Sequence, residues 1–344
     1  MSTHTIEDLR IMQALPLSVK VRMTETRIRQ WVNHYGENGV YVSFSGGKDS
    51  TVLLDIVRGL YPEMPAVFVN TGLEYPEIQA FVKTFDNVEI IRPKMRFDEV
   101  IRKYGYPFIS KEISKKIYEI RRGGKETIAY KRLMGIEPYG STLYSAPKYE
   151  PLIEADFSIS DRCCNVMKKG PAHSYTKETK RLPITGQQAD ESRLRTQKWL
   201  QHGCNAFDSG TPVSNPMAFW TEQDVLRYIK ENNLPIASVY GDVVQVDADG
   251  FIYESSMLPS TCPYTTTCCK RTGCIFCGYG AHLEKGEGRF RLLKRTHPKQ
   301  YDYCMGGGGY DPDDGLWKPT KDGLGMAYVI DQLCRLYGKD FIKY

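Results

Sequence analysis

The chain has 344 residues, of which 41% are hydrophobic and 25% charged, and a formal net charge of +5. This composition and length are typical of a folded protein of about two domains, which excludes a disordered chain, a collagen-like fibre and a small disulfide scaffold. No apolar run approaches the roughly 20 residues that span a bilayer, and the first residues lack the apolar stretch of a secretory signal. We therefore expect a cytoplasmic protein with no membrane partner, whose ten cysteines serve as ligands or reactive thiols.

The first hundred residues alternate between helical and strand patterns. In chain order, the sequence predicts a helical segment over 1–35, a strand over 40–44, a helix over 50–57, a strand over 66–69, a helix over 77–85 and a strand over 88–91. Strands that alternate with helices predict an α/β fold with a mostly parallel twisted sheet and helices on both faces. Such sheets bind ligands at the carboxyl ends of their strands.

The second part of the chain continues this pattern and then changes character. It predicts a basic helix over 109–134, a strand over 181–185 and helices over 189–200, from Thr221, over 290–295 and over 324–336. Beyond Pro235 the chain becomes rich in cysteine. We expect an N-terminal helical segment over 1–35, a nucleotide-binding α/β domain over 36–235 and a cysteine-rich and C-terminal helical region over 236–344.

A glycine-rich turn lies between the first predicted strand and the helix that follows it. Its sequence is Ser45-Gly46-Gly47-Lys48-Asp49-Ser50. Glycines let the backbone wrap closely around an anion, and the amides of the turn and of the new helix then point at a phosphate. Lys48 adds a positive charge and the two serines add hydroxyl donors. The spacing is not that of a Walker loop.

This turn resembles the PP-loop of the adenine nucleotide α-hydrolase superfamily, whose members split ATP between the α and β phosphates. Three further segments are similar, in the right order, to the phosphoadenosine phosphosulfate (PAPS) reductase family: Asn70–Glu77, Gly186–Arg195 and Pro216–Val225. The resemblance covers about residues 36 to 240 and one cysteine pair beyond. It implies an adenine nucleotide α-hydrolase-like fold with a small cysteine-rich C-terminal part.

The resemblance also assigns residues to a nucleotide. It implies that Ser45 to Ser50 hold the phosphates and that Asn70, Thr71 and Gly72 lie at a strand end near the nucleotide, as does Gly186. Arg193 and Arg195 would reach the anionic end, because guanidinium groups suit phosphate. The alternative for the two arginines is an ordinary solvated helix face.

The cysteines form a second constellation. An adjacent pair, Cys163 and Cys164, precedes a Cys-x-x-Cys pair, Cys274 and Cys277, and four thiolates suit either Zn²⁺ or an iron–sulfur cluster. The resemblance to the iron–sulfur branch of the family favours a [4Fe-4S] cluster. The alternative is a local zinc site in which Cys262, Cys268 or Cys269 replaces the first pair. The insert over 243–272 makes the gap between the pairs longer than in the family.

Two departures from the reductases decide the expected reaction. The C-terminal Glu-Cys-Gly-x-His motif that carries their nucleophilic cysteine is absent, and only Cys304, just ahead of four glycines, offers a mobile substitute. The core from Gly46 to Asp49 is intact, as in the ATP-splitting members. We therefore expect Lys48 and Asp49 to take part in splitting ATP, with Mg²⁺, into AMP and pyrophosphate.

The leading hypothesis is thus an enzyme that activates an acceptor for sulfur transfer, with the cluster binding or passing the sulfur. One alternative is a PAPS or adenylylsulfate reductase with Cys304 as a displaced nucleophile. Another is a nucleotide-binding protein with a structural metal site. Sulfur transfer would also need a sulfur donor, such as a donor protein.

The acceptor is expected from the charge pattern. The stretch Lys111–Arg132 holds eight basic residues against three acidic ones, which favours a nucleic-acid acceptor. The alternative for this stretch is a solvated helical face.

Overall fold

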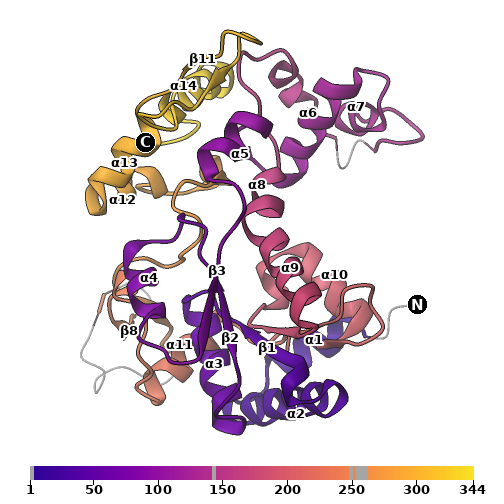
Figure 1. Cartoon of the computed structure of the whole chain (residues 1–344), viewed down its shortest axis with the longest axis vertical. Coiled ribbons are helices and arrows are strands. Elements are labelled where there is room, and N and C mark those ends of the chain that lie inside the picture. Colours follow the sequence, from indigo (N-terminus) through magenta and orange to yellow (C-terminus); the bar gives the residue numbers. More distant parts are fainter. Residues whose placement is uncertain (1–3, 142–144, 248–250, 253–261) are drawn as a thin grey trace. The chain divides into compact units, whose positions relative to one another are not determined.

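The computed structural model describes residues 4–141, 145–247, 251–252 and 262–344 (Figure 1). The chain forms two compact units that are interleaved along the sequence. Unit 1 comprises Met1–Asn70, Glu74–Arg92 and Ala172–Thr272, and unit 2 comprises Thr71–Leu73, Pro93–Pro171 and Gly273–Tyr344. The domain boundaries expected at residues 35 and 235 stay a prediction.

Unit 1 is built on a six-stranded sheet with the order β3-β2-β1-β5-β7-β6. Its strands are β1 (Val40–Ser43), β2 (Ala66–Val69), β3 (Val88–Ile91), β5 (Leu182–Thr185), β6 (Asn205–Ala206) and β7 (Val213–Ser214). Neighbouring strands are parallel except for the pair β6 and β7 at one edge. The mostly parallel sheet predicted from the alternating pattern is therefore confirmed.

Strand β1 lies in the middle of this sheet. Val42 is opposite Ala66 of β2 on one side and Ile184 of β5 on the other. Val40, Val42 and the following Phe44 are buried almost completely. A strand covered on both faces reads as a continuous apolar run, and this is why residues 40–44 lack the alternation of an exposed strand.

The helices of unit 1 follow the predicted order. They are α1 (Ile6–Gln13), α2 (Leu17–Tyr35), α3 (Lys48–Leu60), α4 (Pro76–Val82), α10 (Arg193–His202) and α11 (Glu222–Glu231), with α9 (Gly170–Thr179) beginning in unit 2. Thr221 caps α11 in a capping box with Asp224, as the sequence predicts. The same carboxylate of Asp224 forms an ion pair with the buried Lys20 at 2.6 Å, which ties α2 to α11. A small antiparallel pair, β8 (Val243–Gln245) and β9 (Tyr264–Thr266), completes the unit.

Unit 2 is mainly helical. Its helices are α5 (Phe97–Tyr104), α6 (Lys111–Gly123), α7 (Ile128–Met134), α8 (Arg162–Cys164), α12 (Arg289–Thr296), α13 (Pro298–Met305) and α14 (Met326–Tyr337). Two short pairs join its segments: β4 (Phe108–Ile109) with β10 (Gly278–Tyr279), and β11 (Gly309–Tyr310) with β12 (Trp317–Lys318). The sequence pattern did not predict α5, α9 or α13.

The predicted basic helix over 109–134 is in fact two helices. Gly124 has a positive φ of 78°, a conformation that glycine adopts at little cost, and ends α6. The hydroxyl of Thr127 then caps α7 by accepting the Tyr130 amide. The two helices pack against each other in Figure 1.

No helix within the described ranges has both the length and the apolar character needed to cross a membrane.

Candidate active site

The glycine-rich turn joins β1 to α3, as predicted, and α3 begins at Lys48. Gly46 has a positive φ of 69°, and a Cβ atom there would lie 2.7 Å from Cγ2 of Val82. Both the conformation and the packing of α4 therefore require glycine at this position. The Ser45 and Ser50 hydroxyls lie 3.0 Å apart, and Ser50 Oγ also accepts the Ser45 amide. The loop is held by its own side chains.

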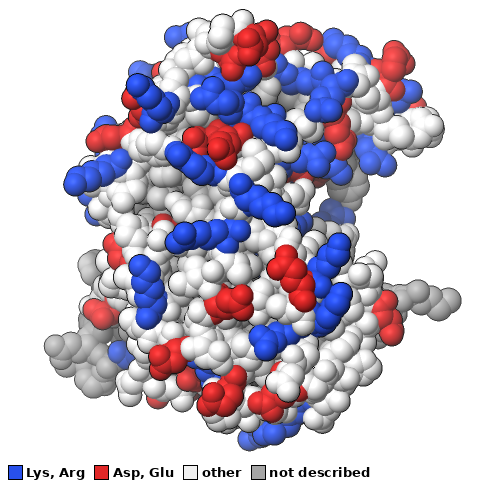
Figure 2. All heavy atoms as spheres, in the orientation of Figure 1, with Lys and Arg blue, Asp and Glu red and all other residues white. Residues whose placement is uncertain are grey.

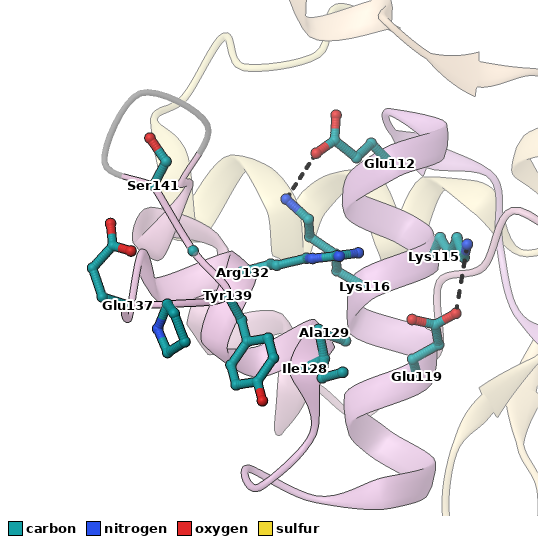
Figure 3. A pocket seen from close by; sticks show the side chains of 12 residues that line it. Glu112, Lys115, Lys116, Glu119, Ile128, Ala129, Arg132, Glu137, Tyr139 and Ser141 are labelled. Carbon is teal, nitrogen blue, oxygen red and sulfur yellow. Dashed lines mark ion pairs between the residues drawn. The ribbon is translucent and has the colours of Figure 1, made fainter.

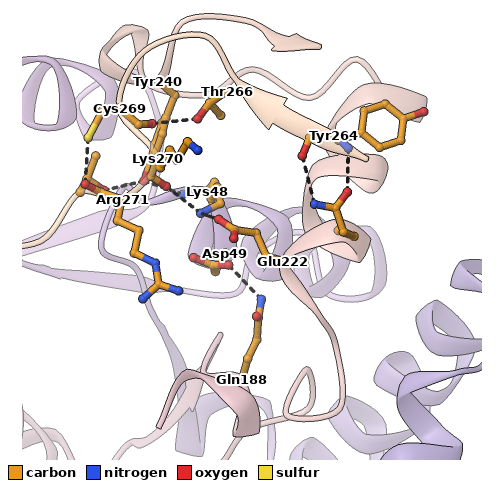
Figure 4. A network of polar contacts seen from close by, with 12 residues as sticks. Lys48, Asp49, Gln188, Glu222, Tyr240, Tyr264, Thr266, Cys269, Lys270 and Arg271 are labelled. Carbon is orange, nitrogen blue, oxygen red and sulfur yellow. Dashed lines mark hydrogen bonds and ion pairs between the residues drawn. The ribbon is translucent and has the colours of Figure 1, made fainter. Parts of the chain in front are cut away.

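Lys48 is buried, with 4% of its surface exposed. Its ammonium donates to the carbonyl of Lys270 at 3.1 Å and forms an ion pair with Glu222 Oε1 at 3.0 Å. Its backbone amide donates to the hydroxyl of Tyr240 at 3.2 Å. Figure 4 shows these contacts converging on one residue. The charge and the amide that would bind a phosphate are thus already engaged by groups of unit 1.

Tyr240 covers the loop with a hydroxyl. Its oxygen lies 2.5 Å from the hydroxyl of Thr272. A Cβ atom on Gly47 would lie 3.3 Å from the same Tyr240 oxygen. Burial raises the pKa of Tyr240 to about 12, so the phenol keeps its proton at neutral pH. Since its oxygen accepts the Lys48 amide, its own proton is available to Thr272.

Asp49 lies at the same end of α3. Burial raises the pKa of its carboxyl group, and the charge of Lys48 opposes this shift. Gln188 donates to Asp49 Oδ1 at 3.0 Å. Burial lowers the pKa of the Arg195 guanidinium, and the nearby charge of Asp49 opposes this shift. Arg195 also forms an ion pair with Glu191. The carboxylates of Asp49 and Glu222 and several donors therefore surround the start of α3.

The carboxyl ends of neighbouring strands bring these groups together. Gly186 follows β5, and a Cβ atom there would lie 3.0 Å from the backbone oxygen of Asp49, so glycine permits the close approach of this strand end to α3. Arg193 begins α10, and Asn70 follows β2. Thr71 and Gly72 belong to unit 2, where the Thr71 hydroxyl accepts the Leu73 amide at 3.1 Å. The roles of these residues toward a nucleotide stay predictions.

Sequence reasoning did not single out four of these neighbours, Gln188, Glu222, Tyr240 and Thr272, as site residues. It also missed Arg271, whose charge acts to lower the pKa of Asp49. Gln188 and Glu222 lie inside segments that carry the family resemblance, so their positions offered a signal. Tyr240, Arg271 and Thr272 lie in stretches without a motif, and only the fold brings them to the loop.

The two cysteine pairs both lie in unit 2. Cys163 and Cys164 are in α8, and the Cys277 amide donates to the Cys274 carbonyl at 3.0 Å in a tight turn. A hydrogen bond from the Cys163 thiol lowers the pKa of Cys164 and raises that of Cys163, and the charge of Lys111 lowers the pKa of Cys164 further. The charge of Cys164 also contributes to a raised pKa of Cys277, whose main cause is burial.

Three of the four predicted ligands are thus close enough to affect one another electrostatically. Over the described part of the chain, however, no three His, Cys, Asp or Glu side chains are arranged to hold a metal ion. The donor set suits a metal–sulfur group by its chemistry, but its geometry here is not that of a formed site. The metal role of these cysteines stays a prediction, and no reaction step is derived through it.

Cys304 was expected to be mobile, but the structure buries it in a helix. It lies in α13, its surface is 0% exposed, and its sulfur packs 3.2 Å from Met326 Sδ. Burial raises the pKa of its thiol far above the usual value. The thiolate is the reactive form, so this structure argues against Cys304 as a mobile nucleophile. The following glycines do not loosen it, because α13 ends only after Cys304.

The alternative zinc ligands lie in unit 1. Cys269 donates to the backbone oxygen of Arg271 at 2.8 Å, whereas Cys268 is exposed. The replacement of Cys163 and Cys164 by these residues stays a prediction.

A family model named phosphoadenosine phosphosulfate reductase domain matches residues 39–143 and 135–278, which is more than half of the chain. The chain belongs to the PAPS reductase family. This confirms the resemblance inferred from the phosphate loop and the three later segments.

Curated proteins with similar sequences are distant from this chain. An adenosine 5'-phosphosulfate reductase of Lysinibacillus sphaericus is 24% identical, over 60% of this chain and 70% of the relative. A phosphoadenosine 5'-phosphosulfate reductase of Buchnera aphidicola is 22% identical, over 67% and 77% of the two chains. Subunit 2 of a sulfate adenylyltransferase of Agrobacterium fabrum is 26% identical, over 57% and 56%. The crystal structure of a PAPS reductase from Candida auris, a phosphate complex, aligns with a TM-score of 0.37 and 16% identity, over 69% of this chain and 91% of that one.

In this PAPS reductase family member, some basic side chains of the stretch over 111–132 are engaged in contacts within the fold. Lys116 is buried and forms an ion pair with Glu112 at 2.8 Å. Arg121 donates to the carbonyls of Ala155 and Phe157. These two basic residues support the fold. In Figure 2, Lys and Arg side chains over unit 2 alternate with Asp and Glu and form no continuous basic field.

Helices α6 and α7 and the residues after them line a solvent-open pocket of about 700 Å³ (Figure 3). Arg132 points into it, beside the apolar side chains of Ile128 and Ala129 and the ring of Tyr139. Lys115 and Lys116 form its opposite wall, each near a glutamate. Three basic and three acidic residues line the pocket, so it offers no net positive charge to an anion.

Proposed function

We propose that this PAPS reductase family member binds ATP with Mg²⁺ and splits it into AMP and pyrophosphate to activate an acceptor for sulfur transfer. The observation that carries the proposal is the intact phosphate loop with a buried lysine at its centre: Lys48 is 4% exposed and lies at the start of α3. Charge develops on pyrophosphate as it departs, and a preorganised ammonium and helix amides stabilise that charge.

In this proposed reaction the residues of the phosphate loop bind the phosphates and the metal ion. Lys48 binds the departing phosphates once its contact with Glu222 is exchanged. The hydroxyls of Ser45 and Ser50 donate to phosphate oxygens. Asp49 would hold Mg²⁺, since carboxylates are its usual protein ligands alongside substrate phosphates, and the ion supplies positive charge to the leaving group. The carboxylate of Asp49, half-buried at the start of α3 and within reach of the charge of Lys48, is compatible with that role.

The relatives' names support both ATP cleavage and the alternative, reduction of a sulfonucleotide. The sulfate adenylyltransferase subunit is named for adenylyl transfer, which is the kind of step proposed here. The reductases are named for reduction of a sulfonucleotide. The burial of Cys304 weighs against that second function in this chain, because no other cysteine was predicted to act as the nucleophile.

The affinities of the chain for ATP and for the two sulfonucleotides distinguish ATP cleavage from sulfonucleotide reduction. We would measure calorimetric binding of Mg·ATP, PAPS and adenylylsulfate under anaerobic conditions, on protein assayed for iron, sulfide and zinc. ATP is expected to bind most tightly, and Lys48→Ala to lower its affinity at least about tenfold. Lys83→Ala, which removes an exposed lysine of the same unit, is the control. Tighter binding of a sulfonucleotide would overturn the proposal in favour of reduction.

We also propose that the acceptor is a nucleic acid that contacts the exposed basic residues of α6 and α7. Lys115, Arg122 and Arg132 are exposed, and phosphate neutralisation by such residues makes binding fall with salt. Replacing all three with glutamate should weaken RNA or DNA binding and flatten its salt dependence. The control replaces Lys83, Lys177 and Lys230, exposed lysines of unit 1. Equal effects of the two triple variants would refute the assignment of this surface.

A further inference from the structure

The segment Cys268–Thr272 contacts the phosphate loop on both sides of Arg271. The Lys270 carbonyl accepts from the Lys48 ammonium at 3.1 Å. The Thr272 hydroxyl lies 2.5 Å from the Tyr240 hydroxyl, and a Cβ atom on Gly47 would be 3.5 Å from it. Since the residues before and after it are held in this way, the backbone of Arg271 is fixed beside the loop.

The side chain of Arg271 extends from this segment toward the start of α3 (Figure 4). In Figure 4 its guanidinium lies on the side of the loop that also holds Asp49. Its charge is close enough to act on the pKa of Asp49, Asp190 and Arg195. Arg271 therefore belongs to the same electrostatic neighbourhood as the loop, although 222 positions separate Lys48 from Lys270, the residue before Arg271.

The cations around the loop differ in how they are paired. Lys48 is paired with Glu222, and Arg195 with Glu191. No hydrogen bond or ion pair from any described residue occupies the guanidinium of Arg271, and its side chain is exposed. An unpaired guanidinium that is held by its backbone is ready to take an anion with two parallel hydrogen bonds.

We propose that Arg271 binds the terminal phosphates of the nucleotide and so selects nucleotides with a phosphate chain over AMP. This inference rests on the function proposed above and adds a specificity residue to it. When a phosphate oxygen accepts the Lys48 amide, it takes the place of the Tyr240 oxygen. The protonated phenol is then free to donate to the same phosphate. The segment Cys268–Thr272 thus supplies a second positive group opposite Lys48.

Calorimetric titration of the full chain with inorganic pyrophosphate, ATP and AMP tests this assignment. In Arg271→Gln the affinity for pyrophosphate and ATP should fall by about 10- to 100-fold, the effect of losing a charge-assisted hydrogen bond. AMP binding should change by less than about twofold. Arg271→Lys should fall between the two proteins, because it keeps the charge and loses the fork.

Lys230→Gln removes an exposed positive charge from α11 of the same unit and should leave all three affinities unchanged. If Arg271→Gln behaves like Lys230→Gln while Lys48→Ala loses ATP binding, this inference fails and the proposed function stands. If the wild-type protein binds neither ATP nor pyrophosphate, both fail. An unchanged melting temperature for Arg271→Gln would show that an altered affinity is not a folding defect.

Discussion

The ammonium of Lys48 lies 3.0 Å from Oε1 of Glu222. The lysine is almost completely buried, whereas 44% of the glutamate side chain is exposed. A phosphate that binds Lys48 therefore competes with a carboxylate that can turn away into solvent. The pair keeps the buried charge neutralised until an anion arrives, and the exposure of Glu222 makes the exchange easy.

Glu222→Gln should strengthen the binding of ATP and pyrophosphate by about two- to fivefold. The variant removes the competing carboxylate, and a partly exposed ion pair is worth no more than about 1 kcal/mol. Calorimetric dissociation constants measure the effect. Glu231→Gln, which removes a carboxylate paired with Arg227 on the same helix, is the matched control. Weaker binding in Glu222→Gln would show that the pair prepares Lys48 for phosphate instead of competing with it.

Gly46→Ala should lower the free energy of unfolding by about 2 kcal/mol and abolish tight nucleotide binding. The substitution forces a positive φ on alanine and drives its methyl group into Val82 and Ile78. Gly59→Ala, inside the following helix α3, adds a methyl group with no atom of another segment within 4 Å and should instead stabilise by up to about 1 kcal/mol. Urea unfolding of both variants checks the pair. A stable, nucleotide-binding Gly46→Ala protein would contradict the described loop.

Asp49→Asn should raise stability at neutral pH and weaken Mg·ATP binding. Burial raises the folded-state pKa of Asp49 above its usual 3.8, so the folded state holds its proton to a higher pH than the unfolded chain. The ionisation of Asp49 therefore does not destabilise the folded protein below pH 3.8, and it destabilises it increasingly as pH rises through the folded-state pKa. The gap between the two proteins should accordingly close in acid. Thermal unfolding across pH measures this, and a gap that widens in acid would contradict it.

Cys304 should resist alkylation in the native protein. Its burial keeps the thiol neutral and out of reach, whereas the exposed Cys268 should react with iodoacetamide. Peptide mass spectrometry before and after unfolding identifies each site. Cys304→Ser should cost about 1–3 kcal/mol, since it buries a hydroxyl, and leave pyrophosphate release unchanged. Native labelling of Cys304, together with loss of sulfite release in the serine variant, would restore the displaced-nucleophile hypothesis.

We predict that the purified chain contains iron and sulfide, or zinc, and that replacing Cys164 or Cys277 with serine removes most of it. Cys334→Ser is the control, because its sulfur donates to the Ile342 carbonyl and it is not among the predicted ligands. Elemental and sulfide assays on anaerobic preparations give the readout. Equal metal content in all three variants would exclude the four predicted cysteines as the site.

Local pattern alone determined much of unit 1. The phosphate loop, β1, β2, β3 and the cap of α11 could each be predicted, because glycine geometry, apolar runs and capping residues act within a few positions of one another. The family followed for the same reason, since its motifs are short and ordered. Helix α5 did carry a local signal, a capping box between Arg96 and Glu99, and was missed all the same. Helix α9 lacks an apolar face, since Tyr175 is its one buried residue.

Only the tertiary structure decided what surrounds Lys48. Its amide meets a hydroxyl 192 positions away, in Tyr240, and no local rule relates such distant residues. The same holds for the burial of Cys304, which depends on α13 packing against α14, and for Lys116 and Arg121, whose charges are used within the fold. Residue type and spacing predict which groups bear chemistry, whereas packing of remote segments determines which of them remain free to use it.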